Sequence, residues 1–103
     1  MFERRSLIFH IVCLLLVSTP VAWGGDPNNG AKIYLKHCLS CHGSTGRSMT
    51  PGTPDFSMGQ SLQNPDPVLA ATIKSGKKLM PAYLGILKEE EIADVIGYIR
   101  TLF

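Results

Sequence analysis

The sequence predicts an all-α fold, with three main helices and long connecting loops in a single domain. Apolar residues recur at helical spacing in three separate stretches, and no stretch has the alternation expected of a β-strand. Between the first two helical stretches, residues 43–65 are rich in Gly, Pro, Ser and Thr. The chain has 103 residues and no internal repeat, so one domain accounts for it.

The N-terminal segment, residues 1–24, is expected to be a secretory signal peptide, which leaves 25–103 as the domain. Arg4 and Arg5 precede an apolar run over 7–17, and small residues flank Trp23. Eleven apolar residues are too few for a comfortable membrane span. We therefore expect export to the periplasm; the alternative is an uncleaved segment that anchors the protein to the membrane.

The first expected helix begins near Asp26 and Pro27, because aspartate is a good N-cap and proline suits the first helical position. The second is expected to open in the same way at Asp66, with Gly76 just past its end. The third covers about 88–101. Its apolar stripe has the spacing i, i+3, i+4 and i+7 and consists of Ile92, Val95, Ile96 and Ile99.

The residues that remain after signal removal form a small, nearly neutral chain. Eight Lys and Arg stand against seven Asp and Glu in these 79 residues, a formal charge of +1. This balance does not indicate a nucleic-acid-binding surface. A chain of this length buries little core by itself, so a covalent or metal-based staple is expected.

A Cys-x-x-Cys-His motif at Cys38, Cys41 and His42 predicts what that staple is. This spacing is typical of covalent c-type haem attachment. The two thiols add to the porphyrin vinyl groups, and the histidine reaches the iron from the same side of the ring. We expect one haem c, bound through two thioethers, with His42 as an axial ligand.

Other readings of the same motif are weaker. A zinc site needs further ligands, yet no cysteine or histidine follows His42. A redox-active dithiol is expected near a βαβ pattern, which the chain lacks. A structural disulfide would not require the histidine.

Met80 is the expected second axial ligand of the iron. Pro81 favours an extended conformation at the preceding residue, so the thioether would be presented from a loop between the second and third helices. A histidine–methionine pair raises the reduction potential of a haem relative to two histidines. Met49 and Met58 remain alternative ligands, and Met80 could also simply fill a gap in the core.

The chain resembles small bacterial class I monohaem cytochromes c over residues 26–103. The resemblance rests on motifs in a fixed order: Gly30 with Tyr34, then Cys38–His42, Gly52–Phe56, Met80–Tyr83 and the final stretch with Ile92, Val95, Tyr98, Arg100 and Leu102. It implies the cytochrome c fold, in which the first and last helices cross at Gly30 and Tyr98. It also implies a proline carbonyl that accepts a hydrogen bond from the proximal imidazole, here Pro54, with Pro51 as a second possibility.

An iron with histidine and methionine on both axial positions has no vacancy for a substrate. We therefore expect a soluble electron carrier without enzymatic activity or small-molecule substrate, monomeric and exchanging electrons with redox proteins. Lys74, Lys77 and Lys78 precede the methionine loop and are a candidate docking patch for an acidic partner. Ordinary solvated surface is the alternative for these lysines.

Two other functions remain open at this stage. The chain could be a haem subunit dedicated to one periplasmic oxidoreductase. It could also be a haem enzyme or gas sensor in which Met80 is easily displaced from the iron.

Overall fold

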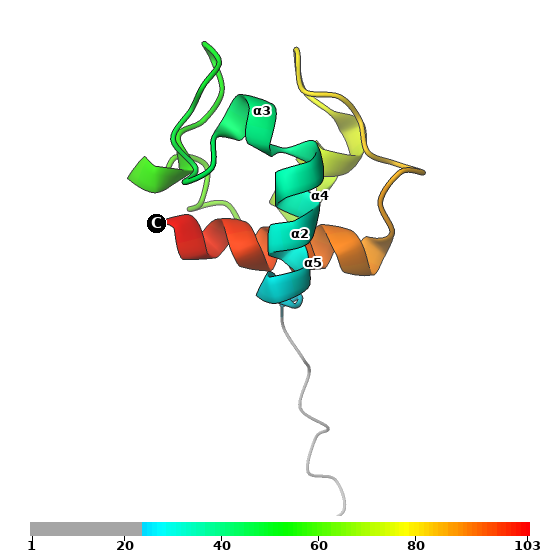
Figure 1. Cartoon of the computed structure of the whole chain (residues 1–103). Coiled ribbons are helices and arrows are strands. Elements are labelled where there is room, and N and C mark those ends of the chain that lie inside the picture. Colours follow the sequence, from blue (N-terminus) through cyan, green and yellow to red (C-terminus); the bar gives the residue numbers. More distant parts are fainter. Residues whose placement is uncertain (1–23) are drawn as a thin grey trace, which may run out of the picture.

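The computed structural model describes residues 24–103 and confirms the all-α prediction. No strand occurs in this part of the chain, only two isolated bridge pairs. The expected signal peptide lies outside the described residues, apart from Gly24. The helices are α2 (Pro27–His37), α3 (Leu39–His42), α4 (Asp66–Ser75) and α5 (Glu89–Ile99), with 3-10 turns η1 (Phe56–Met58) and η2 (Arg100–Leu102) (Figure 1).

Helix α2 begins where the sequence predicts. Asp26 is extended, and its carboxylate accepts a hydrogen bond of 2.9 Å from the Asn28 N–H, while Pro27 is the first helical residue. The helix buries Gly30, Ile33 and Tyr34. Its apolar face is therefore directed at the core.

Helix α2 crosses α5 at a very close approach (Figure 1). A Cβ atom on Gly30 would lie 1.9 Å from the carbonyl oxygen of Asp94, so only glycine fits there. One turn further on, the Tyr34 and Tyr98 rings meet edge to face with centroids 5.1 Å apart. The Asp94 carboxylate of α5 also joins the two helices, because it accepts hydrogen bonds from the Asp26 N–H at 2.7 Å and the Asn29 side-chain amide at 2.8 Å.

Helix α4 starts one residue earlier than expected. Pro65 is the N-cap, with an extended backbone, and Asp66 is the first helical residue. The Asp66 carboxylate does not cap the helix; it pairs instead with the Arg100 guanidinium, at 2.8 Å from Nε and 2.6 Å from Nη2. The predicted end is confirmed, because Gly76 follows Ser75 with a φ of 73°.

Helix α5 is shorter than the predicted 88–101. Lys88 is its N-cap, but a lysine side chain has no acceptor for the free N–H groups of the first turn. The stabilising contact is made instead by a side chain within the helix. The Lys88 N–H donates to the Glu91 carboxylate at 3.0 Å. At the other end the chain tightens into η2, where the Thr101 hydroxyl donates to the Tyr98 carbonyl at 2.6 Å.

The core gathers the inward faces of the helices and a few loop residues. Helix α5 contributes its whole predicted stripe, and the aromatic members come from α2, η1 and the loop after α4. The buried apolar residues are Ile33, Tyr34, Phe56, Ile73, Tyr83, Leu87, Ile92, Val95, Ile96 and Ile99. Within residues 24–103, His42 is the only buried residue with an ionisable side chain other than tyrosine.

Two long loops rise on either side of α3 (Figure 1). The first, residues 43–65, is held at its far end by Arg100, whose guanidinium donates to the carbonyls of Leu62 and Asn64, both at 2.8 Å. The second, residues 76–88, is pinned to α4 because the Tyr83 N–H donates to the Ile73 carbonyl at 2.9 Å. Both loops frame the side of the molecule where the cysteine motif lies.

Candidate haem site

The Cys-x-x-Cys-His motif occupies one turn directly after α2. Cys38 ends α2 and precedes α3, and its carbonyl accepts from the Cys41 N–H at 3.3 Å and the His42 N–H at 2.9 Å. Both sulfurs are thus presented from the same short segment. The Cys38 thiol is half-buried, and burial, together with the nearby Cys41 sulfur, raises its pKa to about 11. Cys41 is exposed.

His42 is buried at the end of this turn, with 8% of its surface exposed. Its ring stacks on Phe56 with centroids 4.6 Å apart and planes 8° from parallel. Burial lowers the pKa of the imidazole, and the neighbouring Pro54 carbonyl offsets part of that effect. The ring is therefore held neutral, the form in which histidine binds a metal.

The Nδ1 atom of His42 is sealed from solvent without a partner. Among the described residues it forms no hydrogen bond of normal geometry, although the Pro54 carbonyl is close enough to affect the pKa of the ring. Buried polar atoms are rarely left unpaired without a functional reason. A small approach of Pro54 to Nδ1 would satisfy this atom and fix the orientation of the ring.

Gly43 turns the chain sharply away after His42. Its φ is 78°, and a Cβ atom there would lie 2.1 Å from the Arg47 carbonyl oxygen. The Gly43 carbonyl accepts a hydrogen bond of 2.6 Å from the Tyr34 hydroxyl, and Tyr34 is completely buried. The turn that ends the motif is thus held against α2.

Met80 lies in a tight turn of the second loop and packs partly buried against the core. Two backbone hydrogen bonds with Lys77, of 3.1 and 3.0 Å, close the turn. Lys78 within it has a φ of 56°, unusual for a residue other than glycine. The alternative ligands are far more open to solvent, since Met49 is 69% exposed and Met58 is 71% exposed.

Tyr83 links the Met80 loop to the cysteine motif, a contact that sequence reasoning missed. Its ring is buried, its hydroxyl donates to the His37 carbonyl at 3.0 Å, and its ring meets the His37 ring edge-on. His37 itself is half-buried beside the Tyr83 ring. No local pattern could reveal this contact, because the two residues are 46 positions apart.

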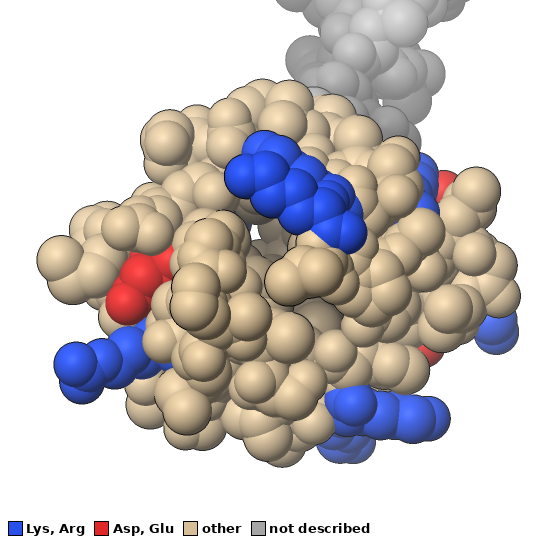
Figure 2. Space-filling view, turned by 90° about the horizontal axis from the view of Figure 1, so that it is seen from above, with Lys and Arg blue, Asp and Glu red and all other residues tan. Residues whose placement is uncertain are grey.

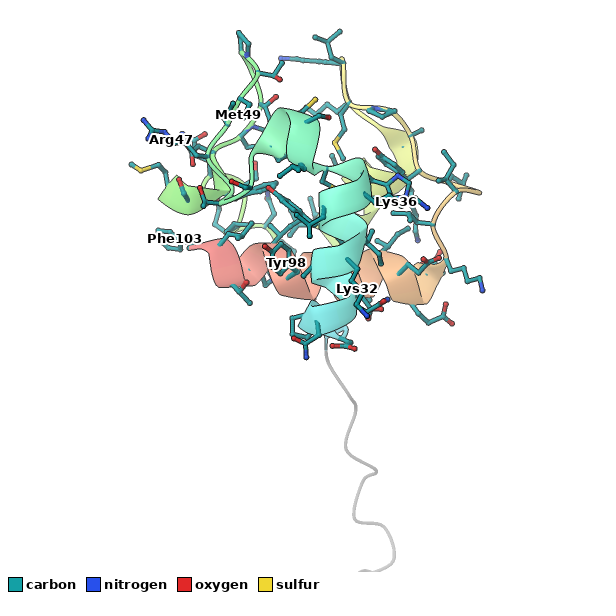
Figure 3. All side chains as sticks on the ribbon, viewed as in Figure 1. Lys32, Lys36, Arg47, Met49, Tyr98 and Phe103 are labelled. Carbon is teal, nitrogen blue, oxygen red and sulfur yellow. The ribbon has the colours of Figure 1, made fainter. Side chains whose placement is uncertain are left out.

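The face that carries the motif has few charged side chains at its centre (Figure 2). Seen from above, Figure 2 shows a hollow near the middle of this side, bordered mainly by uncharged side chains, with Lys and Arg side chains placed around it. In Figure 3, Arg47 and Met49 lie on the first loop, and Lys36 lies near the end of α2. Of the three predicted docking lysines, Lys74 is tied to Glu89 by an ion pair of 2.7 Å.

These residues fit a c-type haem. One turn presents two thiols and a neutral buried imidazole, and the loop opposite carries a half-buried thioether. A groove between α4 and α5 is lined by none of these residues. The geometry defines the chain as a cytochrome c of the small, single-haem kind.

Comparison with known proteins supports the same class. Residues 25–99 match the family described as "Cytochrome C oxidase, cbb3-type, subunit III", and the chain belongs to this family of cytochromes c. Cytochrome c6 of Thermosynechococcus vestitus is 31% identical over 102 residues, which cover 96% of this chain and 91% of that protein. Cytochrome c6 of Pyropia yezoensis is 25% identical over 105 residues, 98% of this chain and 94% of that protein.

The fold agrees as well. The crystal structure of cytochrome c6 from the diatom Phaeodactylum tricornutum superposes with a TM-score of 0.58 at 28% identity, covering 75% of this chain and 93% of that one. The predicted cytochrome c fold is thus confirmed. The chain carries one covalently bound haem c and works as an electron carrier.

Proposed function

We propose that the protein is an exported single-electron carrier whose haem iron is held between His42 and Met80. Cys38 and Cys41 form the two thioether bonds. The observation that carries the proposal is the buried, neutral His42 imidazole at the end of the turn that bears both thiols. When bound, the haem supplies an iron that takes up and returns one electron.

The ligand side chains are supported from behind by the fold. Phe56 stacks on the His42 ring and limits its rotation. The Pro54 carbonyl is the group that would accept a hydrogen bond from Nδ1–H after a small approach. Met80 is favoured over Met49 and Met58 because it alone of the three packs against the core. If His42 and Met80 both hold the iron, no position is left for a substrate, and the site would suit electron exchange rather than turnover.

Replacement of the ligand tests the assignment. In Met80→Ala, we expect the thioether-to-iron absorption band of the oxidised protein to disappear and the reduced protein to bind carbon monoxide. Met58→Ala is the matched control, because it removes an exposed thioether and should leave the band intact. If Met58→Ala loses the band and Met80→Ala keeps it, the assignment of Met80 is wrong.

We propose redox proteins as the partners and a monomeric carrier that docks through the tip of the second loop. Lys77 and Lys78 are exposed there beside Leu79, which is 87% exposed. The Lys74–Glu89 pair leaves Lys74 with a smaller part in docking than the sequence suggested. An apolar tip flanked by positive charge is suited to a partner surface that is acidic around an apolar centre.

Salt dependence of electron transfer tests the docking patch. The double variant Lys77→Gln/Lys78→Gln should reduce an anionic inorganic redox complex more slowly at low ionic strength, and the difference should vanish in high salt. Lys32→Gln, an exposed lysine on α2, is the control (Figure 3). Equal rates for the double variant and the wild type at low salt would refute the patch.

We further propose that residues 1–24 are a signal peptide and that the carrier works in the periplasm. The basic start, the short apolar run and the small residues around Trp23 support this, as does the need to attach c-type haem outside the cytoplasm. In residues 24–103, no helix is both long enough and apolar enough to cross a bilayer. N-terminal sequencing of the exported protein should begin at Gly25; recovery of Met1 in membranes would favour an anchor.

A second candidate function follows from the family description. That description names a subunit of a cytochrome c oxidase, so the alternative is that the chain serves one oxidoreductase as a dedicated haem subunit. Purification from the native membrane and soluble fractions separates the two. Constant co-purification with one enzyme would favour the subunit, and recovery as a free monomer would favour the carrier.

A further inference from the structure

Two tyrosine hydroxyls bracket the haem-attachment segment. The Tyr83 hydroxyl donates to the carbonyl of His37, the residue directly before Cys38. The Tyr34 hydroxyl donates to the carbonyl of Gly43, the residue directly after His42. Each hydrogen bond therefore lies at one end of the five-residue segment, and neither donor belongs to it.

Both acceptors are carbonyls at helix ends. His37 is the last residue of α2, and Gly43 is the C-cap of α3. Carbonyls in the last turn of a helix lack the intrahelical partner that interior carbonyls have, so an outside donor is worth more there. The two hydroxyls thus fix the backbone on both sides of the thiols and the imidazole.

The two tyrosines come from different parts of the fold. Tyr34 is on α2, only nine positions from Gly43, and its ring is locked at the crossing with α5. Tyr83 is on the second loop, three positions after Met80, with Pro81 in between. Because the Tyr83 N–H is also bound to Ile73 of α4, the residue connects three elements.

We propose that Tyr83 is a positioning residue that keeps the Met80 loop closed over the attachment segment. Movement of the loop away from the segment must break the hydrogen bond to His37 and separate the Tyr83 and His37 rings. Tyr34 holds the His42 end of the same segment and does not move with the loop. The proposal rests on ligation of the iron by Met80.

Competition by added imidazole tests the proposal in the oxidised holoprotein. Imidazole can bind only when Met80 leaves, so its apparent affinity reports the cost of opening the loop. The net contribution of such a hydrogen bond to stability changes an equilibrium constant by roughly two- to tenfold. Tyr83→Phe, which keeps the buried ring, should therefore bind imidazole roughly two- to tenfold more tightly than the wild type.

Two matched variants separate positioning from general destabilisation. Tyr34→Phe also loses a buried hydrogen bond, but this bond lies at the His42 end of the attachment segment. The variant should therefore have a lower denaturant midpoint and an unchanged affinity for imidazole. Tyr98→Phe removes a hydroxyl that forms no hydrogen bond within residues 24–103 and should change neither quantity. An unchanged imidazole constant in Tyr83→Phe, or an equal change in Tyr34→Phe, would overturn the proposal.

The wild-type spectrum separates this proposal from the assignment of the ligand. If the oxidised wild type lacks the thioether band, Met80 is not a ligand and both ideas fail. If the band is present and responds to Met80→Ala, but Tyr83→Phe behaves as the wild type does toward imidazole, only the positioning role fails.

Discussion

The buried Tyr34 hydroxyl should make the folded protein less stable as the solution becomes alkaline. This pH dependence should disappear when Tyr34 is replaced by phenylalanine. Burial, with smaller effects of the nearby Cys38 and Tyr98 groups, raises the pKa of Tyr34 from 10.0 to about 12. The folded protein therefore favours the neutral phenol, while in the unfolded chain the same phenol ionises near its ordinary pKa. The stability that Tyr34 contributes is complete below about pH 10 and is lost as the pH rises toward about 12.

The size of the effect follows from the shift. Two pKa units at about 1.4 kcal/mol each correspond to a loss of about 2–3 kcal/mol between these limits. In the holoprotein Cys38 is a thioether without charge, so its contribution to the shift is lost, while burial and the nearby Tyr98 still raise the pKa of Tyr34. The loss of about 2–3 kcal/mol is therefore an upper limit for the holoprotein. Tyr34 is fully buried, which means that solvent screening does not reduce the effect.

Denaturant unfolding at a series of pH values measures this pH-dependent loss of stability. Unfolding free energies of the wild type and Tyr34→Phe, followed by circular dichroism from about pH 9 to about pH 12, should differ in slope. The variant is less stable at pH 9 because it lacks the hydrogen bond to Gly43, and its disadvantage should shrink or reverse by pH 12. Parallel curves across this range would show that the phenol is not buried as described.

Three further predictions test other parts of the structure. Gly30→Ala should destabilise the protein by about 1–3 kcal/mol, since the new Cβ would lie 1.9 Å from the Asp94 carbonyl oxygen. Thermal unfolding measures this loss of stability. A loss no larger than that caused by Lys32→Ala would count against the close crossing of the helices. Ser57→Ala should raise the pKa of Asp55, because the Ser57 hydroxyl donates a hydrogen bond that holds this pKa low. The stability that the Asp55 carboxylate contributes is present above its unfolded pKa and is lost as the pH falls through its folded pKa. NMR titration of the carboxyl group measures the change, and an unchanged titration in the variant would contradict the contact. Arg100→Met should cost about 1–3 kcal/mol and loosen residues 62–66, measured by hydrogen exchange; unaltered exchange would show that the guanidinium does not hold the loop.

Local patterns in the sequence predicted most of the fold. The start of α2 at Asp26–Pro27 and the apolar stripe of α5 depend on neighbours within one or two turns, so periodicity and capping rules recover them. The attachment motif is likewise contiguous. The His42 and Met80 assignments follow from these local signals and remain proposals until tested by substitution.

Contacts between distant residues could not be predicted in this way. Asp66 looked like an N-cap, but Arg100, 34 positions away, recruits its carboxylate and the helix begins one residue earlier. Lys74 looked like part of a free docking patch, yet the fold brings Glu89 to within 2.7 Å of it. In both cases the decisive partner lies on another helix, and no spacing rule connects the two positions.

The most direct test of a six-coordinate haem in this protein is the optical spectrum of the purified protein, oxidised and then reduced, together with its pyridine haemochrome. A haem held by Cys38, Cys41, His42 and Met80 should give a c-type haemochrome, a thioether-to-iron band in the oxidised form, and no change when carbon monoxide is added to the reduced form. A high-spin spectrum with rapid carbon monoxide binding would contradict ligation by Met80 and favour a haem enzyme or gas sensor.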